Sequence, residues 1–138
     1  MEVQHLWRSS TRVTDDSELA LALAHGLQGH KPQLGFPADA VAARYCDWLD
    51  SKPFDMGTTC ASAFSVTRGT LGSSGNNDKH APDPGLATTM RARAAGSQAS
   101  KANGALMRCT PLAVWGSRLS TDELVAAAVA DATLSHPN

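Results

Sequence analysis

The sequence contains no isoleucine, few aromatic residues and almost no net charge. Its 138 residues include three Phe, three Trp and one Tyr, while 23 Ala and 14 Leu far outnumber seven Val. Because β-branched and aromatic residues favour strands, whereas Ala and Leu favour helices, this composition predicts an all-α protein. With 12 Lys and Arg against 13 Asp and Glu, there is no basic excess to neutralise phosphates, so we expect no nucleic-acid partner.

Long hydrophobic runs and paired cysteines are also missing. No apolar stretch approaches the roughly 20 residues that cross a bilayer, so we expect no membrane partner. Residues 1–5 have neither the basic patch nor the apolar core of a secretory signal, which predicts a cytoplasmic protein. The cysteines at 46, 60 and 109 are widely spaced and odd in number. We interpret them as reduced thiols rather than as a disulfide framework or a zinc site.

Hydrophobic periodicity and capping residues predict about six helices. The first begins at a capping box formed by Asp15 and Glu18, and it ends before Gly29. Its expected buried face consists of apolar residues at helical spacing, namely Leu19, Ala22, Leu23, Gly26 and Leu27. The last helix begins at a second capping box, formed by Ser120 and Glu123, and ends before His136.

Four further helices are expected between these two. Their ranges are 37–50, 58–69 with a threonine cap, 87–99, and 105–115 with a kink or a restart at Pro111. Residues 71–86 are rich in Gly, Ser, Asn and Pro, so we expect a flexible loop there. The sequence therefore predicts one helical domain over residues 1–138.

Three oxygen-bearing side chains, Thr14, Asp15 and Asp16, stand together at the entry to the first helix. Carboxylate and hydroxyl oxygens are the ligands that Mg²⁺ prefers, so this group could hold a divalent cation. Such residues are also common in first helical turns, where they cap free amides and suit the helix dipole. The residues alone leave both interpretations open.

A second candidate segment runs from Ser100 to Arg108. Asn103-Gly104 readily adopts positive φ, and a helix that begins just after it would direct free amides outward. Those amides, together with Arg108, would suit a pyrophosphate. The alternative is an ordinary turn with Met107 in the core and Arg108 solvated.

A third candidate is His136 at the end of the last helix. A lone histidine in this position usually compensates the helix dipole. From the residues alone, no Ser-His-Asp or Cys-His arrangement points to nucleophilic catalysis.

The order of these segments resembles the ADP-ribosylglycohydrolase family, which includes enzymes similar to dinitrogen-reductase-activating glycohydrolase. Residues 14–22 are similar to the Thr-Asp-Asp helix of the family, and residues 55–59 to a weaker Asp-x-Gly turn. Residues 103–112 resemble its Asn-Gly-x-x-Met-Arg-x-x-Pro-Leu segment, which is long and specific. Residues 132–137 are similar to its helix-ending Thr/Ser-His motif.

The resemblance implies an all-α hydrolase that cleaves the glycosidic bond of ADP-ribose on modified targets with two Mg²⁺ or Mn²⁺ ions. It implies that Thr14, Asp15 and Asp16 are metal ligands, and that Asp15 and Asp16 form the catalytic pair. Substrate contacts are implied for a further set: Asn103, Gly104, Ala105, Met107, Arg108 and His136. ADP-ribose or an ADP-ribosylated protein is then the expected partner.

The same resemblance implies an upstream Gly-Asp motif and a downstream Asp-x-Asp-Thr motif, and neither occurs in the sequence. Only half of the expected metal ligands are therefore present. We expect the chain to be a central part of the family's orthogonal helical bundle, and thus an incomplete one. An alternative function is a non-catalytic remnant that binds ADP-ribose or acts as a scaffold.

Overall fold

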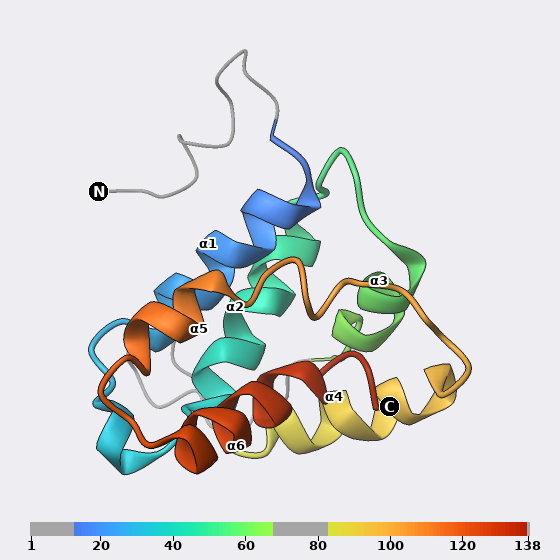
Figure 1. Ribbon diagram of the computed structural model, residues 1–138. Helices are drawn as coiled ribbons and strands as arrows, with labels where there is room; N and C mark the ends of the chain where they lie inside the picture. Colours follow the sequence, from blue (N-terminus) through green and yellow to red (C-terminus); the bar gives the residue numbers. More distant parts are fainter. Residues whose placement is uncertain (1–12, 68–82, 138) are drawn as a thin grey trace, which may run out of the picture.

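The computed structural model describes residues 13–67 and 83–137, which form six α-helices and two short 3₁₀ helices (Figure 1). The α-helices are α1 (Asp15–Leu27), α2 (Ala38–Asp50), α3 (Thr58–Phe64), α4 (Leu86–Ala94), α5 (Thr110–Trp115) and α6 (Thr121–Ala132). The 3₁₀ helices are η2 (Pro32–Leu34) and η3 (Ala95–Ser97). No strand occurs in these two ranges, and the predicted all-α fold is confirmed.

Helices α1 and α2 pack closely along the face that the periodicity predicts. Leu19, Leu23 and the other three residues of the predicted α1 face are buried. Gly26 allows the close approach, because a Cβ atom on it would lie only 2.7 Å from Cα of Val41 in α2. After Leu27 the helix ends, and Gly29 adopts the left-handed φ of 79° that a glycine accommodates without strain.

Of the two predicted capping boxes, one is present in the structure and the other is not. At α6 both reciprocal hydrogen bonds between Ser120 and Glu123 are present, so that prediction is confirmed. At α1 the N-cap residue is Thr14, and no side chain caps the helix, so the predicted box is wrong. The Glu18 carboxylate instead accepts a hydrogen bond of 2.7 Å from the indole Nε1 of Trp48, which α2 brings to it.

The boundaries of three other elements also differ from expectation. Helix α3 begins after Gly57, without a threonine cap, and ends at Phe64 rather than at residue 69. Of the loop expected at 71–86, residues 71–82 lie outside the described residues, and Leu86 is buried as the first residue of α4. Residues 104–108 form turns, so the first half of the helix expected at 105–115 is wrong, and α5 begins only at Thr110, with Pro111 in its first turn.

Helix α4 is held to both neighbours by hydrogen bonds at its two ends. The Asp39 carboxylate of α2 accepts the backbone N–H groups of Gly85 and Ala87, which satisfies amides at the start of α4. Near its other end, Arg91 donates to the carbonyl oxygen of Ala130 and to the hydroxyl of Thr133, at the end of α6. A cation at this place suits the helix dipole.

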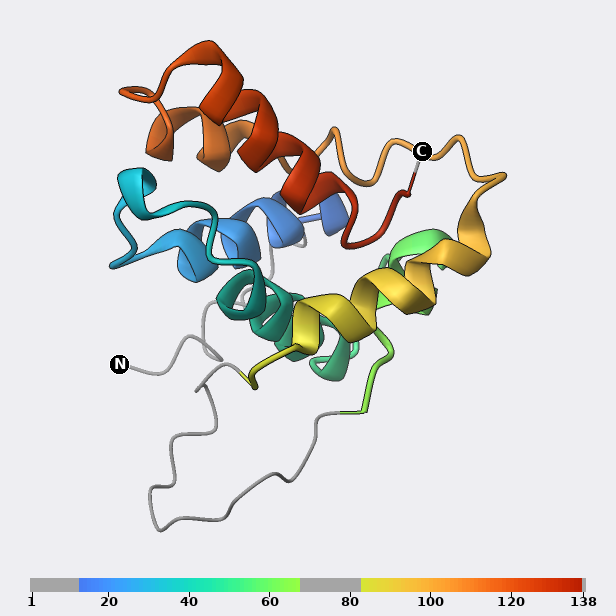
Figure 2. The ribbon, with the colours of Figure 1, turned by 90° about the horizontal axis from the view of Figure 1, so that it is seen from below.

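The segment between η3 and α5 crosses back over the molecule, past α3, to reach α5 beside α1 (Figure 1, orange). Viewed from below, the end of the chain after α6 lies beside this crossing segment (Figure 2). In the part of the chain that the structure describes, no helix has the length and hydrophobicity needed to cross a membrane.

The close approach of α1 and α2 gives a test of the packing. Gly26→Ala would place its methyl group against the backbone of Val41, and overpacking of this kind costs about 1–3 kcal/mol of stability. Gly96→Ala is the matched control, since a Cβ there meets nothing within 4 Å. We expect urea unfolding to show a clear loss for the first variant and none for the second. Equal stability of the two variants would contradict the packing described.

Candidate functional site

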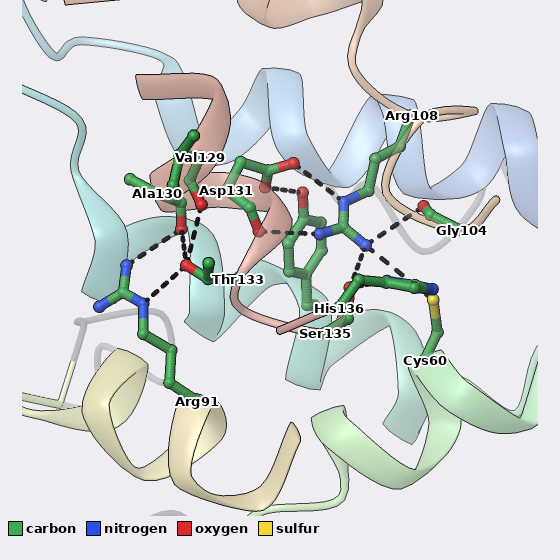
Figure 3. Close-up of polar contacts among 11 residues, drawn as sticks. Cys60, Arg91, Gly104, Arg108, Val129, Ala130, Asp131, Thr133, Ser135 and His136 are labelled. Atoms are coloured by element: carbon green, nitrogen blue, oxygen red, sulfur yellow. Dashed lines mark hydrogen bonds and ion pairs between the residues drawn. The ribbon is translucent and has the colours of Figure 1, made fainter. Parts of the chain in front are cut away.

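The centre of the site is a buried ion pair between Arg108 and Asp131 (Figure 3). Arg108 is 0% exposed, and its Nε donates to Oδ2 of Asp131 at 3.1 Å while Nη2 donates to the backbone carbonyl of the same residue at 3.0 Å. Its Nη1 donates to Ser135 Oγ at 2.8 Å and to the carbonyl oxygen of Gly104 at 3.3 Å. One guanidinium therefore joins the turn at 104–108 to the end of α6.

Two aromatic rings enclose this ion pair. The Tyr45 hydroxyl donates to Oδ1 of Asp131 at 2.6 Å, and burial raises the pKa of Tyr45 well above its ordinary value, so the phenol keeps its proton. The Tyr45 ring stacks on Phe64 of α3, with centroids 4.7 Å apart. The guanidinium of Arg108 lies over the Tyr45 ring at 4.6 Å, within range of a cation–π interaction. Helices α2, α3 and α6 thus meet at Arg108.

His136 follows α6 and is 8% exposed. Its Nδ1 lies 2.8 Å from Ser135 Oγ, whereas its Nε2 is the one buried side-chain nitrogen or oxygen in the described ranges without a hydrogen-bond partner. Burial and the positive charge of Arg108 lower the pKa of His136, so the ring is neutral near pH 7. The dipole-compensating role expected of a histidine here is taken by Arg91 and Arg108.

Gly104 and Cys60 border the His136 ring. A Cβ atom on Gly104 would lie 2.9 Å from Cε1 of His136 and 2.6 Å from Sγ of Cys60, so only glycine lets the ring and the thiol lie against the backbone here. Burial raises the pKa of Cys60, which keeps the thiol protonated and unsuited to nucleophilic attack. None of the three cysteines forms a disulfide; the one at 46 is also buried and the one at 109 is partly buried.

The acidic entry to α1 faces the turn before α3. Oδ2 of Asp15 accepts the backbone N–H of Gly57 at 3.3 Å, and Thr14 Oγ1 donates to Oδ2 of Asp16 at 3.2 Å. Partial burial and the negative charges of Asp55 and Asp16 raise the pKa of Asp15, and the hydrogen bond from Gly57 opposes this only in part. The carboxylates of Asp15, Asp16 and Asp55 repel one another, and a bound cation would reduce this repulsion.

The residues at the entry to α1 are of the types that bind a divalent cation, but they are too few to complete its coordination. Thr14, Asp15 and Asp16 offer the oxygen ligands that Mg²⁺ prefers. Over residues 13–67 and 83–137, however, no group of three or more His, Cys, Asp or Glu side chains is placed to hold a metal ion. The entry to α1 can therefore supply part of a cation site and not a complete one.

The start of α3 connects the acidic entry to the histidine. Gly57 bonds Asp15, as described above, while Thr59 Oγ1 lies 2.8 Å from Ser100 Oγ at the start of the crossing segment. The next residue, Cys60, contacts Arg108 at 3.9 Å and borders His136. The segments that the sequence analysis selected, far apart in the chain, thus converge on residues 57–60.

Individual residues of the crossing segment differ in their accessibility. Asn103 is exposed, Ala105 and Met107 are partly buried, and Gly104 is buried. Arg108 is neither solvated nor open to a ligand, because burial and its bonds to Asp131 engage it within the chain. Two expectations are wrong here: neither Asn103 nor Gly104 has positive φ, and no helix follows them directly to direct amides at a pyrophosphate.

Sequence reasoning missed the partners of Arg108, namely Asp131 and Tyr45. A signal for Asp131 exists, because an acidic residue in the last turn of a helix opposes the dipole and needs a compensating partner. Its position in an otherwise apolar stretch points to burial as well. Tyr45 has the apolar spacing of Val41 and Trp48, which indicates a packed side chain, and nothing in that pattern distinguishes a packing tyrosine from one that bonds a carboxylate.

The described residues form an all-α fold that brings an acidic helix entry, a buried arginine and a buried histidine to the start of α3. The ADP-ribosylglycohydrolase family model matches residues 2–138, so the chain belongs to the ADP-ribosylglycohydrolase family, an all-α family of glycohydrolases. The resemblance drawn from the motifs is thereby confirmed. Comparisons with curated proteins and with solved structures gave no match.

The buried ion pair predicts a large loss of stability when one partner is removed. Arg108→Met leaves the Asp131 carboxylate buried and unpaired, which costs about 3–5 kcal/mol. Arg108→Lys keeps the charge but loses the planar donor set, so we expect an intermediate loss. Arg44→Met is the control, because its pair with Asp47 is partly exposed to solvent and a pair of this kind contributes about 1 kcal/mol or less. Chemical denaturation that ranks Arg44→Met as the least stable variant would contradict this account.

Proposed function

We propose that this chain contributes to the metal-dependent hydrolysis of a glycosidic bond of ADP-ribose on modified proteins or related substrates. One observation carries the proposal most strongly: three segments that resemble family motifs converge on residues 57–60, at the start of α3. Helical packing alone does not require the acidic entry of α1 and the histidine after α6 to lie near the same turn. Family membership supplies the reaction class.

The acidic entry is the proposed cation side of this site. Thr14, Asp15 and Asp16 would contribute oxygen ligands to Mg²⁺ or Mn²⁺. The remaining ligands would come from groups other than these three residues. When bound, the cations supply electrostatic stabilisation of developing negative charge. Asp15 and Asp16 are the proposed catalytic pair.

The crossing segment is the proposed substrate side. Exposed Asn103 and partly buried Ala105 and Met107 are available for contact. Gly104 and His136 are buried beside them and are proposed to line the same side of the site. Arg108 is proposed to hold these residues in position rather than to contact the substrate itself. Because it donates to the carbonyl oxygen of Gly104 and to Ser135, it holds the segment and the histidine in one arrangement.

Release of ADP-ribose from an ADP-ribosylated peptide tests the hydrolase proposal. We expect Mg²⁺-dependent release by the intact chain, and at least a hundredfold loss in Asp16→Asn, because one charged ligand is removed from the cation side. Asp50→Asn is the matched control, since this exposed aspartate ends α2 and lies outside the site. Equal rates for Asp16→Asn and Asp50→Asn would contradict the catalytic role.

The alternative function, a binding or scaffolding remnant, makes a different prediction in the same assay. Its support is that the described residues supply too few ligands for a complete metal site. ADP-ribose would then bind with equal affinity to the wild type and to Asp15→Ala, and no peptide would be hydrolysed with or without Mg²⁺. Metal-dependent turnover that Asp16→Asn abolishes would exclude this alternative.

The repulsion at the acidic entry predicts that removing the charge of Asp15 stabilises the folded chain but weakens its binding of Mg²⁺. Because the folded pKa of Asp15 lies above its unfolded value, this group favours folding at low pH and opposes it as pH rises through the folded pKa. We therefore expect Asp15→Asn to raise the melting temperature in metal-free buffer at pH 7. Addition of Mg²⁺ should stabilise the wild type and leave Asp15→Asn unchanged. A lower melting temperature for Asp15→Asn without metal would contradict the repulsion described.

A further inference from the structure

We propose that the outward face of α6 is a self-association surface, on which a second copy of this chain packs its own α6 antiparallel to the first. The outward face consists of exposed residues at helical spacing, namely Thr121, Asp122, Val125, Ala128 and Val129. Figure 2 shows α6 at one edge of the molecule. This pairing does not depend on the proposed hydrolysis of ADP-ribose.

The outward face is apolar where the exposed side of a helix is usually polar. Residues 124–132 contain one charged residue, Asp131, which is buried in its ion pair. Val125 and Val129 lie one turn apart and are each 54% exposed, and Ala128 beside them is exposed as well. Because a helix without a partner normally directs polar residues at the solvent, this face indicates a binding partner.

The composition of the face favours another helix over a membrane as the partner. Helices that lie on a membrane surface carry Lys or Arg on one side and large apolar residues such as Trp and Phe on the other. Residues 121–132 contain no Lys, no Arg and no aromatic residue. Valine and alanine side chains are short, so two helices that present them can pack closely against each other.

A two-fold axis between two antiparallel α6 helices brings the valines together. When Val125 of one copy lies opposite Val129 of the second copy, the symmetry also places Val129 of the first opposite Val125 of the second. The same register sets Asp122 opposite Ala132 of the second copy, because each lies three residues beyond its valine. The acidic first turn of each α6 is therefore beside the last turn of the other.

Charge complementarity supports this register. Arg91 of α4 lies at the last turn of α6, where its Nε donates to Thr133 Oγ1 and its Nη2 to the carbonyl oxygen of Ala130. The side chain is partly buried, and in the described part of the chain no hydrogen bond uses its Nη1 group. Asp122 of the second copy would lie beside this guanidinium, and the two-fold axis repeats the contact at the other end. A parallel pairing would instead set the two Asp122 carboxylates against each other and align the two helix dipoles unfavourably.

The size of the surface sets the expected strength of association. One face of a 12-residue helix buries much less area than the roughly 1,600 Å² of a standard interface, so the contact is of the weak, reversible kind. We expect a dimer with a Kd on the order of 100 µM. Sedimentation equilibrium of the full chain with reductant, at up to about 500 µM, measures it. A chain that stays monomeric over this range overturns the proposal, because a second copy then does not cover α6.

Substitution of one valine distinguishes this face from nonspecific hydrophobic association. Val129→Lys places a charge against Val125 of the second copy, and we expect it to weaken association at least tenfold. Leu34→Lys is the matched control, since Leu34 is 84% exposed on η2 and lies outside α6. Circular dichroism and urea unfolding should show that both variants fold. Equal weakening of association by the two substitutions would overturn the proposal.

The charge of Asp122 tests the contact with Arg91. Asp122→Arg should weaken association more than Asp122→Asn does, because it sets two cations against each other. Asp50→Asn is the control, since it removes the same charge from the exposed end of α2 and should leave the Kd within about twofold. If Asp122→Arg associates as strongly as Asp50→Asn, the antiparallel pairing is wrong.

Disulfide trapping reads the register directly. Positions that lie directly opposite each other form a disulfide more readily than positions offset along the helix axis. When Val125→Cys and Val129→Cys chains are mixed and oxidised, we expect the mixed disulfide dimer to exceed the share that random pairing gives. The wild-type chain, whose cysteines are buried or partly buried, supplies the background. A predominance of Val125→Cys homodimers would indicate a parallel pairing and overturn the proposal.

Discussion

The buried pair of Arg108 and Asp131 is the interaction on which the arrangement of this protein depends. Neither charge has access to water, so each requires the other to offset the cost of burial. The pair also bonds the backbone carbonyl of Asp131 at the end of α6, the carbonyl of Gly104 and the hydroxyl of Tyr45. Satisfying all of them at once leaves little freedom in how α2, α6 and the crossing segment are placed.

The buried ion pair also fixes the position of the candidate site, because it holds the crossing segment in place. Because the crossing segment makes turns rather than a helix between residues 104 and 108, its position is set mainly by tertiary contacts. Arg108 provides these contacts, and His136 and Cys60 pack against Gly104 on the same side. At the other end of the site, the bond from Gly57 to Asp15 holds the acidic entry of α1 against the turn that leads into α3. The chemistry-bearing groups are thus held by a few buried bonds rather than by one long helix.

Much of the fold could be predicted from local patterns because these patterns act within a few residues. The buried face of α1, the extent of α2 and the capping box of α6 each follow from spacing or from a local hydrogen bond. Where a local pattern competes with a distant partner, the prediction fails. Glu18 has the spacing of a capping box and still bonds Trp48, which is 30 residues away. The local pattern around Arg108 suits either a pyrophosphate contact or a solvated side chain, and the residue is instead buried because its partner lies 23 residues further along the chain.

By itself, the sequence determined the helical class, most of the helices and the family, because composition, periodicity and linear motifs are properties of the chain alone. It also named the residues at the acidic entry, in the crossing segment and after α6. Only the tertiary structure decided that Arg108 is enclosed, that Asp131 and Tyr45 contact it, and that one ring nitrogen of His136 has no hydrogen-bond partner within residues 13–67 and 83–137. The physical reason is that burial and hydrogen-bond direction depend on groups that meet in space, and local spacing carries no information about which distant groups will meet.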